Sequence, residues 1–101
     1  MSKNNMRPIH PGEILREEYL VPLGVTANAL SIELRVPAPR INDLVRERRG
    51  VSPDTALRLA RFFNTTPQFW LNLQTSFELK QAEIAVGEKI VQEIHPMQVA
   101  A

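Results

Sequence analysis

The sequence predicts an all-α protein of five helices, the last of them long. Glycine and proline divide the chain into segments, and residues that favour helix starts or ends stand at almost every division. Apolar residues recur at helical spacing, and no segment shows the alternation of a half-buried strand. The 101 residues have room for one domain with one core, to which we assign residues 10–94.

The first predicted helix follows residues 1–9, which predict a flexible N-terminal arm. It begins at His10-Pro11-Gly12-Glu13, where a proline and an acid suit the first turn of a helix. It ends at Pro22-Leu23-Gly24. Its expected apolar face consists of Ile14, Leu15, Tyr19 and Leu20.

Two short helices are predicted next. Thr26 is a good N-cap for a helix from Ala27 to Leu34. After a three-residue connection, another helix is expected from Ala38 to Arg48, with Gly50 as its end signal. The residues expected to face inward are Leu30, Leu34 and either Ile32 or Ser31 on the second helix, and Ile41, Leu44 and Val45 on the third.

The last two helices begin with one signal, an N-cap residue followed by proline. Ser52-Pro53-Asp54 starts the fourth helix, and Thr66-Pro67 starts the fifth. The fifth is expected to reach about Val86, where Gly87 interrupts it, and residues 95–101 are expected to form a flexible tail. The expected apolar face of the fourth helix consists of Leu57, Leu59, Ala60, Phe62 and Phe63.

The composition argues against several classes of protein. The absence of cysteine excludes disulfides, thiolate metal sites and cysteine nucleophiles. The two histidines, His10 and His95, have no partner at metal-ligand or triad spacing, and no glycine-rich phosphate loop is present. We therefore expect no enzyme, no metal and no cofactor. Without a signal peptide or an apolar run near the ~20 residues of a membrane span, the sequence predicts a soluble cytoplasmic protein.

Positive charge is concentrated in the middle of the chain, although the net charge is only +1. Between Arg35 and Arg61 seven arginines face three acids, whereas the segment from Glu78 to Glu93 has two lysines and four glutamates. Arginine suits bidentate contacts with phosphate or guanine. The alternative is an ordinary salt-bridged, solvated surface.

The second and third predicted helices have the layout of a DNA-reading helix-turn-helix, from about Thr26 to Arg49. They are short and amphipathic, they are joined by three residues, and arginines follow the second of the pair. A plain helical hairpin in a bundle that does not bind DNA is the alternative interpretation.

Four strings of the sequence closely resemble the HigA/VapI-type antitoxins, which belong to the Xre helix-turn-helix proteins, with a fold like that of lambda repressor. The resemblance covers about residues 9–85, in the order and spacing of the family. The strings are His10-Pro11-Gly12-Glu13-Ile14-Leu15, Pro22-Leu23-Gly24-Val25-Thr26, Ser52-Pro53-Asp54-Thr55-Ala56-Leu57-Arg58-Leu59-Ala60-Arg61-Phe62-Phe63 and Phe69-Trp70-Leu71-Asn72-Leu73-Gln74.

This resemblance implies a homodimer that binds a palindromic operator at its own promoter and represses its operon. It also implies a partner, a HigB-like toxin of the RelE family, whose cleavage of mRNA the antitoxin suppresses. The alternative is a stand-alone regulator of the same family without a toxin, and the sequence does not separate the two.

The predicted recognition helix departs from the family pattern at its start. Arg35 stands where the family usually has glycine, and a positive φ there would cost about 1 kcal/mol. Proline and alanine replace polar residues at the helix start, where they can touch a thymine methyl but donate no hydrogen bond. Arg40 suits guanine and Asn42 suits adenine, while Asp43 alternatively pairs with an arginine of its own helix. The predicted base-reading residues are Ala38, Pro39, Arg40, Asn42 and Asp43.

A second set of residues is placed for phosphate contacts. Arg46, Arg48 and Arg49 lie at the C-terminal end of the predicted recognition helix, better placed for the DNA backbone than for bases. Thr26 and Ala27 begin the preceding helix, whose free amides can take a phosphate.

The long last helix is expected to close the core and to form a dimer interface. Trp70 and Leu73 are assigned to the core. Phe77, Ile84 and Val91 are seven residues apart, and we expect them to contact a second copy, because a palindromic operator requires a dimer. The acidic end of this helix and the arm of residues 1–9 are the two candidate toxin-binding surfaces.

Overall fold

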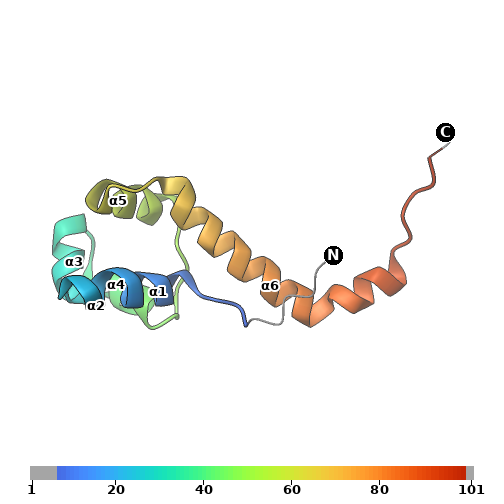
Figure 1. Cartoon of the computed structure of the whole chain (residues 1–101), viewed down its shortest axis with the longest axis horizontal. Coiled ribbons are helices and arrows are strands. Elements are labelled where there is room, and N and C mark those ends of the chain that lie inside the picture. Colours follow the sequence, from blue (N-terminus) through green and yellow to red (C-terminus); the bar gives the residue numbers. More distant parts are fainter. Residues whose placement is uncertain (1–6, 100–101) are drawn as a thin grey trace.

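The computed structural model describes residues 7–99 and is all-α (Figure 1). One continuous helical stretch, made of α1 (Pro11–Ile14), η1 (Leu15–Leu20) and α2 (Val21–Leu23), comes first. It is followed by α3 (Ala27–Leu34), α4 (Ala38–Val45), α5 (Pro53–Phe63) and α6 (Pro67–Glu93). If the first stretch is counted once, the prediction of five helices with a long last helix is confirmed. The far half of α6 projects from the domain, so the molecule measures 56 × 26 × 22 Å.

Most helix starts follow the predicted capping chemistry. The side chains of Thr26, Ser52 and Thr66 accept hydrogen bonds from the third amide of their helices, at 3.1, 3.3 and 3.1 Å. The cap of the first helix is less usual, because His10 provides it: Nδ1 accepts the Gly12 amide at 2.8 Å. These caps satisfy donors that a helix start leaves free.

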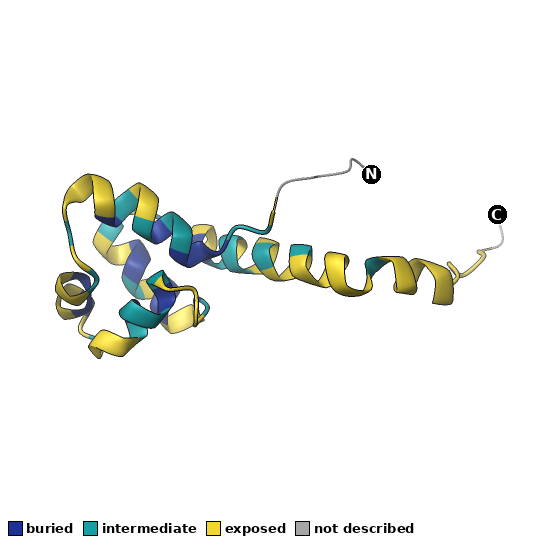
Figure 2. Ribbon diagram, turned by 90° about the horizontal axis from the view of Figure 1, so that it is seen from below, coloured by how far each residue is buried: buried dark blue, intermediate teal, exposed yellow. Residues whose placement is uncertain are grey.

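The core lies between the first helical stretch, α3, α4, α5 and the start of α6 (Figure 2). Trp70 is fully buried, as predicted, and its indole N–H donates to Thr65 Oγ1 at 2.8 Å. The rings of Tyr19 and Phe63 lie against it, and Leu73 is partly buried beside it. The other buried apolar residues are Leu15, Leu20, Leu30, Leu34, Ile41, Leu44, Val51, Ala56, Leu59 and Ala60.

The end of α4 differs from the prediction. The helix ends at Val45 instead of Arg48, and Glu47, with φ of 63°, takes the left-handed conformation. Gly50 therefore does not end the helix. It lies under Gln74 of α6, where an added Cβ would be 2.6 Å from the Gln74 side chain, whose Oε1 accepts the Val51 amide at 2.7 Å. A larger residue at position 50 would therefore displace the end of the Gln74 side chain.

Two other expectations about helices are wrong. The long helix α6 continues through Gly87 to Glu93, because a single interior glycine costs only about 1 kcal/mol. On α5, Leu59 and Ala60 are buried and Phe63 is half-buried as expected, but Leu57 and Phe62 are 60% and 42% exposed. Thr55 and Ala56 complete the buried face. Of the two alternatives on α3, Ser31 is buried and Ile32 is exposed.

Candidate nucleic-acid interface

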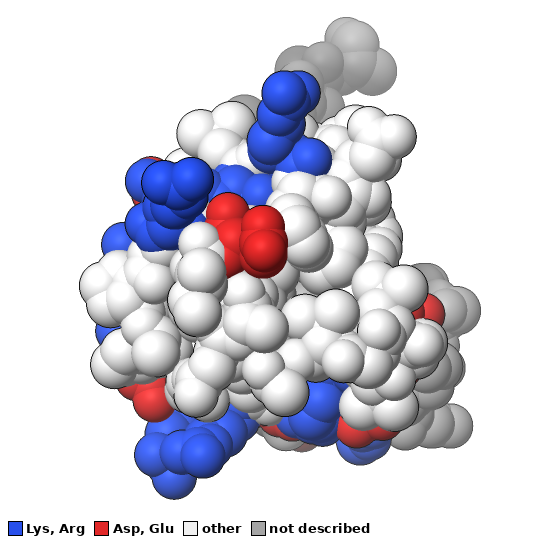
Figure 3. All heavy atoms as spheres, turned by 90° about the vertical axis from the view of Figure 1, so that its left-hand side faces the viewer, with Lys and Arg blue, Asp and Glu red and all other residues white. Residues whose placement is uncertain are grey.

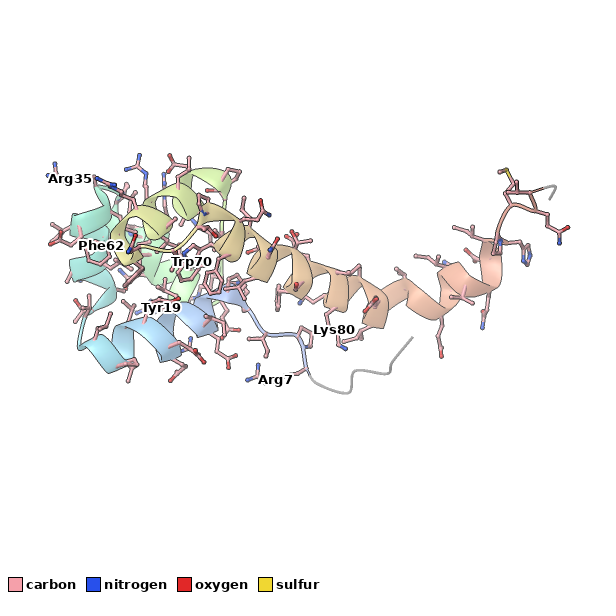
Figure 4. The ribbon with its side chains drawn as sticks, turned by 45° about the horizontal axis from the view of Figure 1, so that its top comes forward. Arg7, Tyr19, Arg35, Phe62, Trp70 and Lys80 are labelled. Atoms are coloured by element: carbon pink, nitrogen blue, oxygen red, sulfur yellow. The ribbon has the colours of Figure 1, made fainter. Side chains whose placement is uncertain are left out.

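The turn between α3 and α4 has the geometry expected for a helix-turn-helix. Arg35 ends α3 with φ of 61° and ψ of 43°, so the strained backbone predicted for a non-glycine residue here is present. The Val36 amide then donates to the Ser31 carbonyl at 3.1 Å, which fixes the connection. Arg35 itself lies exposed at the end of the molecule opposite the projecting part of α6 (Figure 4).

The first turn of α4 is open to solvent. Ala38 and Pro39 are exposed and follow Pro37, the N-cap, which has no side-chain capping bond. Pro39 stands at a first-turn position whose missing amide hydrogen costs the helix nothing. This turn can approach the floor of a DNA groove with apolar contacts only.

Arg40 is held by its neighbours, a contact that the sequence did not predict. Its guanidinium forms an ion pair with Asp54 of α5. Asp54 also accepts Arg58 Nε at 2.9 Å, and Arg58 Nη1 donates to the Leu34 carbonyl at 2.8 Å, at the end of α3. The hydrogen bonds from Arg58 and Arg40 lower the pKa of Asp54. The Asp54 carboxylate thus joins α4 to α5, and Arg58 joins α5 to the end of α3.

Asn42 is also engaged, whereas Asp43 is not. Asn42 Nδ2 donates to Asn28 Oδ1 of α3 at 2.7 Å and to the Ala38 carbonyl at 3.0 Å. Asn28 was missed in the sequence, although a polar residue in the first turn of the preceding helix was a usable signal. Asp43 is half-buried and forms no ion pair with any residue from 7 to 99, so the alternative pairing within its helix is not seen.

The residues expected to contact phosphates surround this turn. Arg46, Arg48 and Arg49 are exposed, and none pairs with an acid in the described part of the chain. Thr26 Oγ1 is occupied by the Ala29 amide, so a phosphate at this helix start would meet the amides of Ala27 and Asn28.

Arg16 is a further basic residue that the sequence reasoning missed. Its Nη1 donates to the Val45 carbonyl at the end of α4, and its Nη2 lies 3.6 Å from a Glu47 carboxylate oxygen. A cation at a helix C-terminus satisfies its last carbonyls. Arg16 therefore caps the C-terminus of α4. An arginine on the polar side of the first helix was the only signal.

Comparisons with known proteins place the chain in a family. The virulence-associated protein I of Dichelobacter nodosus is 59% identical over 81 residues, which cover 80% of this chain and 75% of that protein. A solved structure of the Pseudomonas aeruginosa antitoxin HigA with the higBA promoter has 51% identity and a TM-score of 0.88, covering 91% of this chain and all of that one. The antitoxin GraA in complex with its operator has 50% identity and a TM-score of 0.89, covering 98% and 100%.

The chain belongs to the HigA/VapI-type antitoxins of the Xre helix-turn-helix family. No family model matches it. Members of the HigA/VapI family are regulators and antitoxins, so the protein is not an enzyme, as expected. Among residues 7–99 no cluster of acids and histidines could hold a metal ion, and no helix there has the length and apolar character needed to cross a membrane.

The far half of α6 carries two of the three residues that the sequence predicts for a dimer interface. Ile84 and Val91 are 69% and 76% exposed. Phe77 is half-buried, and its ring lies edge-on to His10 at 4.7 Å between centroids. Phe77 thus contributes to the packing of its own domain.

Proposed function

We propose that the protein is the antitoxin of a HigB–HigA type II module. As a homodimer it binds a palindromic operator at its own promoter and represses its operon. It also binds and neutralises a RelE-like, mRNA-cleaving toxin. Because the operator DNA and the mRNA are both found in the cytoplasm, we place the protein there.

The observation that carries the DNA-binding part is the open first turn of α4 beside unpaired arginines. Ala38 and Pro39 can enter a major groove, and Arg46, Arg48 and Arg49 can bind the phosphates on either side of it. The two relatives solved with promoter and operator DNA share this fold over 91% and 98% of the chain, with 51% and 50% sequence identity. Asn42, Asp43 and, once released from Asp54, Arg40 provide the polar base contacts.

The dimer part rests on exposed apolar residues beyond the core. Ile84 and Val91 share one face of α6, and their burial against a second copy would remove large apolar side chains from water. Phe77 lies on the same face of α6, but its ring packs against His10 and is therefore less available to a second copy. Two copies joined along α6 present two recognition helices, as a palindrome requires.

The toxin part rests on family membership and on charge. The α6 segment from Glu78 to Glu93 is acidic, and this favours a basic partner and disfavours DNA there. Residues 7–9 offer a second surface, and residues 1–6 of the predicted arm lie outside the described part of the chain. A regulator without a toxin is the alternative function.

Co-expression with the adjacent reading frame tests the proposal. If a toxin is its product, the frame alone arrests growth, the pair grows, and the two proteins co-purify. A mobility-shift assay with the upstream DNA is the second readout. A shift without any co-purifying toxin supports the stand-alone regulator, and no shift at all overturns DNA binding.

A further inference from the structure

Among residues 7–99, Asp54 is the only acid that forms ion pairs with two arginines. One is Arg40 of α4 and the other is Arg58 of its own helix, α5. It occupies the first turn of α5 and accepts hydrogen bonds from Arg40 and Arg58. Arg58 is one helical turn further along α5 and is anchored on the Leu34 carbonyl. The position of the Asp54 carboxylate is therefore fixed from its own helix and from α3.

This contact keeps Arg40 from the place where a base would be read. The Arg40 side chain is 30% exposed and extends toward α5, although its Cα lies in the first turns of the recognition helix. A fixed carboxylate at this point also repels nearby DNA phosphates. Arg58 cannot take the place of Arg40, because its guanidinium is already bound at two atoms.

The strengths of the competing contacts decide what can open this pair. Ion pairs between partly exposed side chains are weak, so the pair yields to a better partner. A bidentate arginine–guanine contact favours the correct base over a wrong one by about 5- to 150-fold. A single phosphate in arbitrary DNA offers less, since its attraction is screened and opposed by the Asp54 charge.

We propose that Asp54 competes with DNA for Arg40, so that Arg40 must leave this carboxylate before it contacts a base or a phosphate. This inference rests on the proposed operator binding. It assigns a lowering of DNA affinity to an acid that itself contacts no base.

The test uses Asp54→Asn in the full chain, with the upstream DNA and a scrambled duplex of equal length, over a series of salt concentrations. Arg40 is then free to bind phosphates everywhere. We expect the affinity for the operator to rise about fivefold, because Arg40 no longer has to break the ion pair, and the affinity for the scrambled duplex to rise by no more than that. The slope of log K against log salt on scrambled DNA should steepen by about 0.9, as for one added phosphate contact. The double variant with Arg40→Ala should show neither effect.

Glu33→Gln is the matched control, because it removes one negative charge from exposed α3, and Glu33 forms no ion pair among residues 7–99. Asp54→Ser, which also suits a first turn, should repeat the result if Asn perturbs the helix. If Asp54→Asn matches Glu33→Gln, or if its effect persists in the double variant with Arg40→Ala, the inference is wrong while operator binding stands. A wild-type protein that does not prefer its operator overturns both.

Discussion

Arg35 shows at the scale of one residue how the family fold tolerates an unfavourable backbone. With φ of 61° it carries the strain that the sequence predicted for a non-glycine residue in the turn. Arg35→Gly should raise the free energy of unfolding by up to about 1 kcal/mol, because glycine adopts this conformation without a Cβ clash. Urea denaturation measures the change.

Asn64 provides the control for that prediction, since it ends α5 with φ of 58°. Asparagine tolerates the left-handed region, so Asn64→Gly should gain clearly less. Equal gains at both positions, or a loss at Arg35, would show that the turn is not strained.

His10 is a second residue with a measurable consequence. Burial lowers the pKa of His10 below 6.5, a nearby Glu47 opposes this and Arg16 adds to it. The folded protein therefore binds a proton less readily than the unfolded chain. The neutral His10 side chain therefore contributes fully to the free energy of unfolding above about pH 6.5. This contribution is lost as the pH falls from there toward the folded-state pKa of His10.

The prediction is a fall in the urea midpoint between pH 7.5 and 5.5 that His10→Asn reduces. Asparagine keeps an acceptor for the Gly12 amide but does not titrate in this range. If the variant and the wild type lose stability in parallel, other groups cause the pH dependence.

Among the helices, Gly12 lies in a crowded position and Gly87 in an open one, and substitution of each by alanine tests this difference. An added Cβ at Gly12 would lie 1.8 Å from the Leu44 carbonyl oxygen, where the first helix crosses α4. Gly12→Ala should therefore lower the free energy of unfolding by about 3 kcal/mol or prevent folding.

Gly87→Ala is the matched change in an open position. The nearest atom to its added Cβ is 3.8 Å away, so the variant should gain about 0.5–1 kcal/mol from helix propensity alone. Thermal unfolding of both variants checks the pair. A tolerated Gly12→Ala would mean that the two helices are not in this close contact.

Helix starts were predictable because their chemistry is local, whereas some helix ends were not. Thr26, Ser52 and Thr66 bond to amides three residues ahead, which a sequence displays directly. The end of α4 is capped by Arg16, which is 29 residues away from Val45 in the chain. For the same reason, the sequence did not predict the ion pair between Arg40 and Asp54, which are 14 residues apart.

At the scale of the whole molecule, the far half of α6 accounts for the elongated shape and for the proposed dimer. Ile84→Glu should give a folded monomer with weak operator binding, because the charge lies where apolar contact with a second copy is expected. Sedimentation measures the mass, and circular dichroism confirms the fold. Phe77→Glu is unsuitable, since it would also disturb His10.

Asn72→Glu is the control for Ile84→Glu, as Asn72 is an exposed α6 residue close to the domain. It should leave the mass unchanged if the interface lies further along the helix. A dimer that survives Ile84→Glu, or is lost in both variants, places the interface elsewhere.

The central claim is that the first turn of α4 enters the DNA. Because the chain has no cysteine, Ala38→Cys creates a single thiol there, and Ala85→Cys creates one on exposed α6. The most direct measurement is the rate at which each thiol reacts with a bulky maleimide, with and without upstream DNA. We predict that the upstream DNA slows the reaction at position 38 strongly, that scrambled DNA slows it little, and that position 85 is unaffected. Equal reaction rates at position 38 with and without bound DNA would contradict the claim.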